Sequence, residues 1–344
     1  MHKQFLERFI ALVKPYHKIT ANIVSFLGKK ISLFFQKYFT SWWQIILTLV
    51  FAIVFLYYPF GGWVIHNIDT STYKAQTNDG RLGTIDTISH LINREVHHKL
   101  WTPNLPFIFP SYFLDNMPSF QLGLMSAITT TAKAFDVIPL ISASDAARAN
   151  LKEGIELLQY PGEIWLFSSQ NSLLPAPSSN TQYKKGRKKL NNFNREIAGN
   201  KVSIDKNAQN LSLFLYIIKK DINKNINNLE KHIRENNRSF FDFKADNEFY
   251  FTQGKLYSYS QILKSLGNDF KNVLIKHDIY TPWTSMLKSL EQASKLNPSI
   301  IRNADTNSSF APNHLITINY YATRALNRLN SIINKLDIST DTQL

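Results

Sequence analysis

The chain has 344 residues, no cysteine and a formal net charge of +14, with 44% hydrophobic and 13% aromatic residues. This hydrophobic content excludes a disordered chain. The lack of cysteine excludes disulfides, thiolate catalysis and iron–sulfur clusters. The excess of positive charge favours contact with anionic surfaces, among which we expect lipid headgroups first.

The first 41 residues form a basic segment in which apolar side chains recur at helical spacing. This pattern is typical of an amphipathic helix that lies on an anionic membrane surface, although an ordinary topogenic tail has the same composition. Seven basic residues stand against one acidic residue, namely Lys3, Arg8, Lys14, Lys18, Lys29, Lys30 and Lys37 against Glu7. We therefore expect residues 1–41 to be a cytoplasmic tail that contacts the inner leaflet.

Residues 42–65 contain no charged residue and have aromatic residues at both ends. About 20 mostly apolar residues are needed to cross the hydrocarbon core of a bilayer, so this stretch predicts one transmembrane helix. Positively charged flanks stay in the cytoplasm, which places residues 66–344 outside it. A cleaved signal peptide is the alternative. It fits less well because the basic region is too long and no small-residue cleavage site follows.

Residues 66–344 are predicted to be mainly helical, with helices packed as in a bundle. Apolar residues recur three or four positions apart, as on one face of a helix, in most of this domain. The predicted helices cover 84–100, 117–137, 142–160, 181–198, 207–235, 258–273, 281–296 and 313–336. The last of them is expected to pack inside its own domain. Coiled-coil pairing with a second copy, giving a homo-oligomer, is the alternative.

Residues 240–259 are expected to form a small β hairpin or meander. Aromatic residues alternate there around Asp246, Asn247 and Gly254, and such runs with turn residues between them are typical of short strands. The predicted fold class is therefore mainly α: one transmembrane helix, then a helical domain with this small β element.

No motif of a catalytic or metal site appears in the sequence. H-E-x-x-H, G-x-S-x-G and Walker sequences are absent,. His97 and His98 follow Glu95, but adjacent residues on a helix point about 100° apart, so the two imidazoles are not expected to share a metal ion. We predict no cofactor, no metal and no catalytic residue, and we favour a protein that is not an enzyme.

An aromatic, proline-containing loop precedes the helix predicted at 117. It is a candidate groove for a partner or ligand, because rigid aromatic loops often bind. The candidate residues are Trp101, Phe109, Tyr112, Asp115 and Asn116. Trp101 and Tyr112 are expected to be exposed, and Asp115 or Asn116 to cap the helix. Packing of the loop onto the helical body is the alternative interpretation.

A dense basic run is the second candidate surface. Its residues are Lys184, Lys185, Arg187, Lys188 and Lys189. Such a run would contact lipid phosphate or an anionic glycan, or would be a solvated helix face. Nucleic acid is not an expected partner on the far side of a membrane.

Four sequence blocks carry a resemblance to a known family. They are WTPNLPFIFPS at 101–111, LDNMPSFQLG at 114–123, LLQYPGEIW at 157–165 and FTQGKLYSYSQILKSLGNDF at 251–270. In this order they resemble the DUF2333 family of uncharacterised, membrane-anchored proteins of Gram-negative bacteria, over most of residues 60–335. The resemblance implies an inner-membrane protein with a periplasmic domain. It implies no activity and no site residue.

The sequence leaves two main functional hypotheses, besides a pure scaffold that dimerises through its last helix. The first is a single-span inner-membrane protein whose periplasmic domain binds or scaffolds another envelope component, a protein or a glycan. The second is an envelope hydrolase that cleaves peptidoglycan or a lipid-linked glycan with a carboxylate pair. That chemistry needs a cleft holding two carboxyl groups about 5–10 Å apart, one of them desolvated.

Overall fold

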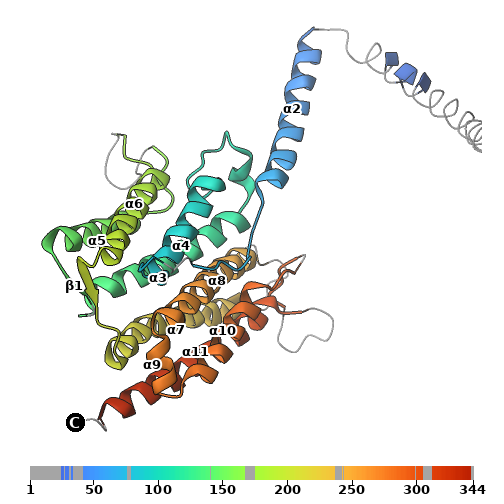
Figure 1. Cartoon of the computed structure of the whole chain (residues 1–344). Coiled ribbons are helices and arrows are strands. Elements are labelled where there is room, and N and C mark those ends of the chain that lie inside the picture. Colours follow the sequence, from blue (N-terminus) through green and yellow to red (C-terminus); the bar gives the residue numbers. More distant parts are fainter. Residues whose placement is uncertain are drawn as a thin grey trace, which may run out of the picture. The chain divides into compact units, whose positions relative to one another are not determined.

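The computed structural model describes residues 25–26, 28–30, 32–33, 42–75, 79–139, 141–166, 175–236, 242, 244–298, 300–304 and 312–341. The chain divides into two compact units, Met1–Gly61 and Gly62–Leu344. Helices predominate in the described part, which confirms the predicted mainly α fold class (Figure 1). The amphipathic tail predicted for residues 1–41 lies mostly outside the described residues and stays a prediction.

Most of helix α2 (Trp42–Ile65) belongs to the first unit. Its bounds coincide with the predicted transmembrane segment, and the helix continues through Pro59. Its mean hydropathy is 2.1, and only 6% of its most apolar stretch is buried by the rest of the chain. Among the described residues, α2 is the one helix long and apolar enough to cross a membrane.

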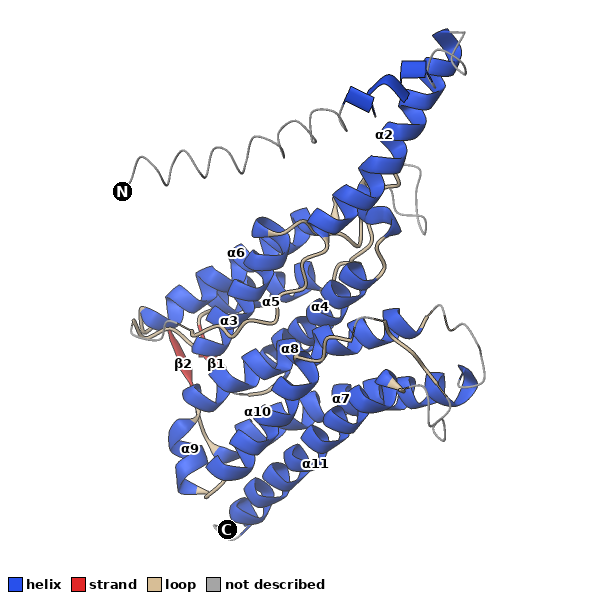
Figure 2. Ribbon diagram, turned by 90° about the vertical axis from the view of Figure 1, so that its right-hand side faces the viewer, coloured by secondary structure: helices blue, strands red, loops and turns tan. Residues whose placement is uncertain are grey.

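The second unit is built from helices and two very short strands. The helical elements are α3 (Gly83–Asn93), the π-helical turn η1 (Arg94–His98), the 3₁₀ turn η2 (Pro110–Phe113), α4 (Asn116–Val137), α5 (Asp145–Leu158), α6 (Ser179–Ala198), α7 (Ala208–Asn236), α8 (Ala245–Asp269), α9 (Lys271–Lys276), α10 (Tyr280–Ser294) and α11 (His314–Asp341). Strands β1 (Ile141–Ala143) and β2 (Val202–Ile204) pair antiparallel at one edge (Figure 2).

Helix α8 is the centre of this unit. It packs against α3, α4, α10 and α11, while α5 pairs with α6, and α7 pairs with α11 (Figure 1). The hydrophobic core runs through all of these helices. Because α8 is covered from several sides, it brings segments from across the unit together.

The β hairpin or meander predicted at 240–259 is wrong, because residues 245–259 belong to α8. A helix that is buried all round shows no apolar stripe, and Phe249, Tyr257 and Tyr259 are all fully buried. Aromatic residues therefore occur on several faces of this helix, and their order along the chain resembles the alternation of a strand. Asp246 lies in the first turn of the helix, and not in a β turn.

Gly254 marks a helix crossing instead of a turn. A Cβ atom on Gly254 would overlap the carbonyl group of Phe120 in α4, and a Cβ atom on Gly123 would overlap the carbonyl group of Phe251 in α8. Glycine allows such a close approach of two backbones because it has no side chain. The two glycines therefore set the contact between α4 and α8.

The apolar seam of α11 packs inside the unit, against α7 and α10. The seam residues Leu315, Ile318, Ala322, Ala325, Leu329, Ile332 and Leu336 are all buried. A coiled coil with a second copy would therefore have to use a different face of α11.

Candidate functional site

Residues 66–73, which follow α2 directly, are fastened to the helical body, and we call them the strap. The Lys99 ammonium donates to the carbonyl oxygen of Asn67 at 2.7 Å, and the Tyr257 hydroxyl donates to that of Ser71 at 2.7 Å. The Tyr73 amide donates to Gln261 at 3.0 Å. The Tyr73 ring also stacks on His90, with ring centroids 3.6 Å apart. The strap is thereby held at several points along its length.

A buried ion cluster lies under the strap. Glu95 is completely buried and accepts from the Arg94 Nε at 2.7 Å and from the Gln121 amide at 3.1 Å. The Lys99 ammonium is 3.7 Å from the same carboxylate. A buried charge is tolerated only when it is paired and hydrogen-bonded. Glu95 satisfies this condition through Arg94 and Lys99, which η1 and its flank supply, and through Gln121 of α4.

The cation of Arg94 completes this cluster. Its guanidinium donates to the Tyr257 hydroxyl at 2.6 Å and lies 3.7 Å from the carboxylate of Asp69 in the strap. Burial lowers the pKa of Arg94, but Glu95 and Tyr257 outweigh it, so the net shift is upward. Arg94 therefore stays charged, and the closed, ion-paired cluster holds the strap in place.

His97 and His98 point away from Glu95. The His98 Nε2 lies 2.9 Å from the Asn93 amide, and the His97 Nε2 lies 3.5 Å from the guanidinium of Arg187. Among the described residues, no group of three potential metal-ligating side chains comes together.

A cleft of about 420 Å³ opens beside the strap. Its walls are residues 66–68 and 70 of the strap, Tyr250 and Gln253 of α8, and residues 294–297 at the end of α10. The Gln253 amide donates to the carbonyl oxygens of Ser294 and Leu296, at 3.0 and 2.6 Å. Its own oxygen is buried without a hydrogen-bond partner. Buried polar atoms normally have partners, so Gln253 leaves an unsatisfied acceptor in the wall of the cleft.

Two carboxylates neighbour this cleft. Asp246 lies in the first turn of α8, and Asp115 directly precedes α4. Burial, then the charge of Asp115 and a hydrogen bond with it, raise the pKa of Asp246. Burial and the two carboxylates also raise the pKa of Tyr250 in the cleft wall. Desolvation lowers the pKa of His66, against the opposing charge of Asp115. These groups form one electrostatically connected set.

Trp101 is buried, so the prediction that it is exposed is wrong. Its indole N–H donates to the carbonyl oxygen of Gly162 at 2.9 Å, and its ring meets Tyr183 edge-on at 5.1 Å. Asn104 donates to the carbonyl oxygen of Ile164 at 3.0 Å. These contacts join the loop to the segment that follows α5. Trp101 therefore serves the packing of the loop and cannot touch a partner.

The other residues of the predicted groove lie closer to the surface. Tyr112 and Asp115 are exposed, and Phe109 and Asn116 are partly buried. Asp115 takes the position before the first residue of α4, but its side chain accepts no capping hydrogen bond. Its neighbours are instead Asp246 and His66. The groove hypothesis thus retains Tyr112 and Asp115 as accessible residues.

The basic run lies on α6 and is divided around that helix. Lys185 and Lys188 are exposed, whereas Lys184, Arg187 and Lys189 are partly buried. Lys189 pairs with Glu153 at 2.6 Å, and Arg187 faces His97. The five cations therefore do not share one face, and their role as an anionic-surface patch stays a prediction.

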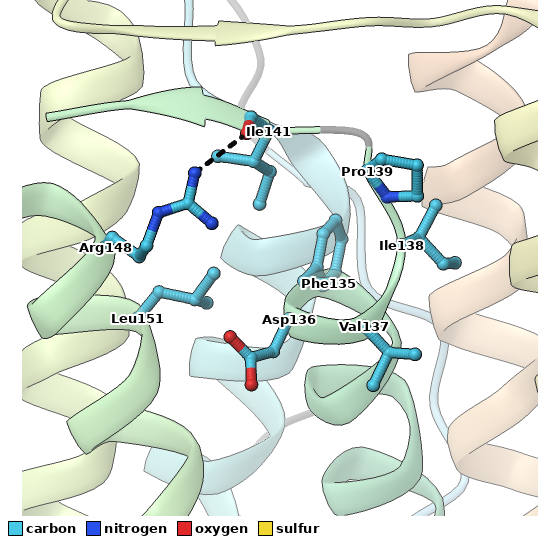
Figure 3. A pocket seen from close by; sticks show the side chains of 8 residues that line it. All are labelled: Phe135, Asp136, Val137, Ile138, Pro139, Ile141, Arg148 and Leu151. Atoms are coloured by element: carbon cyan, nitrogen blue, oxygen red, sulfur yellow. Dashed lines mark hydrogen bonds between the residues drawn. The ribbon is translucent and has the colours of Figure 1, made fainter. Parts of the chain in front are cut away.

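A second cavity, of about 320 Å³, lies at the end of α4. Figure 3 shows the Arg148 guanidinium reaching the carbonyl oxygen of Ile141, at 3.4 Å, with Asp136 in the wall beneath. Arg148 is thus occupied in holding β1. Leu151 and Phe135 supply much of the remaining wall. Among its described wall residues, Asp136 and Arg148 are the titratable ones. In the cleft beside the strap, by contrast, burial and neighbouring charges shift the pKa values of His66 and Tyr250, so that cleft is the better candidate site.

A family model matches residues 216–336. The matching family is DUF2333. Its members are described as an uncharacterized protein conserved in bacteria, which assigns no activity. The resemblance to DUF2333 is confirmed over the matched part, which contains all of α8, α9 and α10 and most of α7 and α11. Searches of the curated proteins and of the solved structures found no match.

Proposed function

We propose that the chain is a single-span protein of the bacterial inner membrane, whose domain from residue 66 lies in the periplasm and binds another component of the cell envelope. The observation that carries this proposal is α2, an uncharged helix of 24 residues with its side chains largely uncovered. Apolar surface costs about 25 cal/mol per Å² in water. A bilayer core is the solvent that relieves this cost over a helix of this length.

The charge distribution supports the orientation. The tail before α2 has seven basic residues and one acidic residue, and such a tail is retained in the cytoplasm. The large domain that follows would then cross to the periplasm.

The cleft beside the strap supports binding within that domain. It offers an unsatisfied acceptor on Gln253 and the side chains of His66 and Tyr250. These groups suit a polar ligand that donates hydrogen bonds, such as a peptide or a glycan. A glycan hydrolase receives less support. Asp115 and Asp246 influence each other electrostatically, but neither of them lines the cleft, whereas such enzymes hold both carboxyl groups in the substrate cleft, about 5–10 Å apart.

The topology is tested by labelling single cysteines, since the natural chain has none. Asn297→Cys should react with a membrane-impermeant maleimide in cells with a permeabilised outer membrane. Ser25→Cys should react only after lysis. Reaction of Ser25→Cys in unlysed cells would overturn the orientation, and protection of both until lysis would place the domain in the cytoplasm.

Binding at the cleft is tested by photo-crosslinking in living cells. A benzoylphenylalanine residue at Thr70 or Asn297 should give a discrete adduct, because both positions line the cleft. Tyr216, an exposed residue of α7, is the matched control and should give none. The same adducts at all three positions, or no adduct at Thr70 and Asn297, would contradict the proposal.

A further inference from the structure

Two neighbouring loops of the second unit expose large apolar side chains. Phe107, Ile108 and Tyr112 are 66%, 53% and 56% exposed, and Trp165 and Leu166 are 44% and 41% exposed. We call these five residues the apolar rim. The two loops are tied together because Trp101 donates to Gly162, and Asn104 to Ile164. The two loops that carry the rim are therefore held together by hydrogen bonds.

The rim adjoins the place where the apolar helix ends. Gly62 lies in the last turn of α2 and belongs to the second unit. A Cβ atom on Gly62 would meet the Leu114 side chain at 3.5 Å and the Pro110 carbonyl oxygen at 3.8 Å. The turn Pro110–Phe113, which contains Tyr112, thus packs against the end of α2. Trp63 in the same turn of α2 is 75% exposed.

The chemistry of the rim matches this location. A transmembrane helix changes from hydrocarbon to water at its end, and Trp and Tyr are enriched at that depth because their rings are apolar and their N–H and O–H groups are polar. The rim contains Trp165 and Tyr112 beside purely apolar residues. A bilayer crossed by α2 ends near the last turn of this helix, where Gly62 lies beside Pro110 and Leu114, so the lipid surface is the occupant that this location favours.

We propose that the apolar rim rests in the interfacial layer of the bilayer that α2 crosses, so that the domain touches the membrane at a second place. This inference rests on the proposed membrane span of α2. The occupant is the lipid surface itself, and contact of the rim with a second copy of the chain is an outcome that the test distinguishes.

The test uses the full chain with single cysteines, labelled with a nitroxide and reconstituted in bilayers of phosphatidylethanolamine and phosphatidylglycerol. Oxygen concentrates in lipid, and a nickel chelate stays in water. The ratio of collision rates with the two reagents should be several-fold higher for Ile108→Cys and Trp165→Cys than for Ile275→Cys. Ile275 is the matched control because it is 60% exposed, on α9.

Leu49→Cys, on an exposed position of α2, separates this inference from the membrane span itself. If the ratio is high at Leu49 but the rim positions give the same ratio as Ile275, the rim contact alone is overturned. A water-like ratio at Leu49 would overturn the span, and the rim contact with it. Protection of Ile108→Cys from both reagents would mean contact between copies and would also overturn the inference. Phe107→Cys repeats the measurement at an independent position, and the thermal melt of each variant reports that it is folded.

Discussion

Replacing Gly254 by alanine should push α4 and α8 apart. The new Cβ atom would overlap the carbonyl group of Phe120 and lie 3.1 Å from the amide nitrogen of Leu124. These are backbone atoms of a helix, so they cannot rotate away as a side chain would. Overpacking of a core costs about 1–3 kcal/mol, and the better helix propensity of alanine returns about 1 kcal/mol. With rigid backbone as the obstacle, we expect a net loss of about 2 kcal/mol in the free energy of unfolding.

The assay is thermal unfolding of the full chain in detergent, followed by circular dichroism. In a domain of this size, 1 kcal/mol shifts the Tm by about 2–4 °C, so Gly254→Ala should melt about 4–8 °C lower than the natural chain. Gly199→Ala is the matched control. Gly199 has a φ of −81° and no neighbour closer than 3.4 Å to the added Cβ, so this variant should keep its Tm or gain slightly. If Gly254→Ala melts no lower than Gly199→Ala, the proposed backbone contact between α4 and α8 is refuted.

Three further predictions concern the loop, the ion cluster and the acid pair. Trp101→Ala should cost about 3–5 kcal/mol in urea unfolding because the ring is buried, whereas Tyr112→Ala should change it by less than about 0.5 kcal/mol; equal losses would contradict the different roles of the two rings. Glu95→Gln leaves Arg94 buried beside a neutral amide and should cost about 3–5 kcal/mol, and a loss near zero would show that the cluster does not hold the strap. The folded pKa of Asp246 is raised above its ordinary value of 3.8, so its ionisation opposes folding as pH rises through that window. At neutral pH, Asp246→Asn should therefore have a higher Tm than the natural chain, and below pH 3.8 the two Tm values should be equal. A difference in Tm that is constant with pH would argue against the raised pKa.

The sequence was informative wherever one side of a helix is buried and the other is not. The seams of α7 and α11 could be predicted because Leu215, Ile222, Leu329 and their equivalents are buried while most of the positions between them are not. α2 could be read from its length and its lack of charge. The first half of α8 was not predicted, since periodicity needs a contrast between faces and this part of the helix has little, whereas its second half falls within the helix predicted at 258–273. The strands β1 and β2 have three residues each, too few to show any alternation.

The candidate cleft was beyond sequence reasoning for a different reason. Its parts come from the strap, from α8 and from the end of α10, and Asp115 and Asp246 are brought together only because α4 packs on α8. Asp115 was expected at the start of a helix, whereas Asp246 was assigned to a β element and lies in the first turn of α8. Nothing in the local pattern said that these two helix starts are neighbours.

The aromatic loop shows why composition alone does not assign a binding residue. Trp101 and Tyr112 stand in one irregular segment, where no period distinguishes inside from outside. Trp101 is buried and its indole N–H donates to the carbonyl oxygen of Gly162, whereas Tyr112 lies in the turn η2 and is exposed. One ring therefore closes the loop onto the body, and the other is left exposed at the end of the apolar helix. An experiment on this loop has to change the two rings separately, because a joint substitution would unfold the loop and remove the rim in the same step.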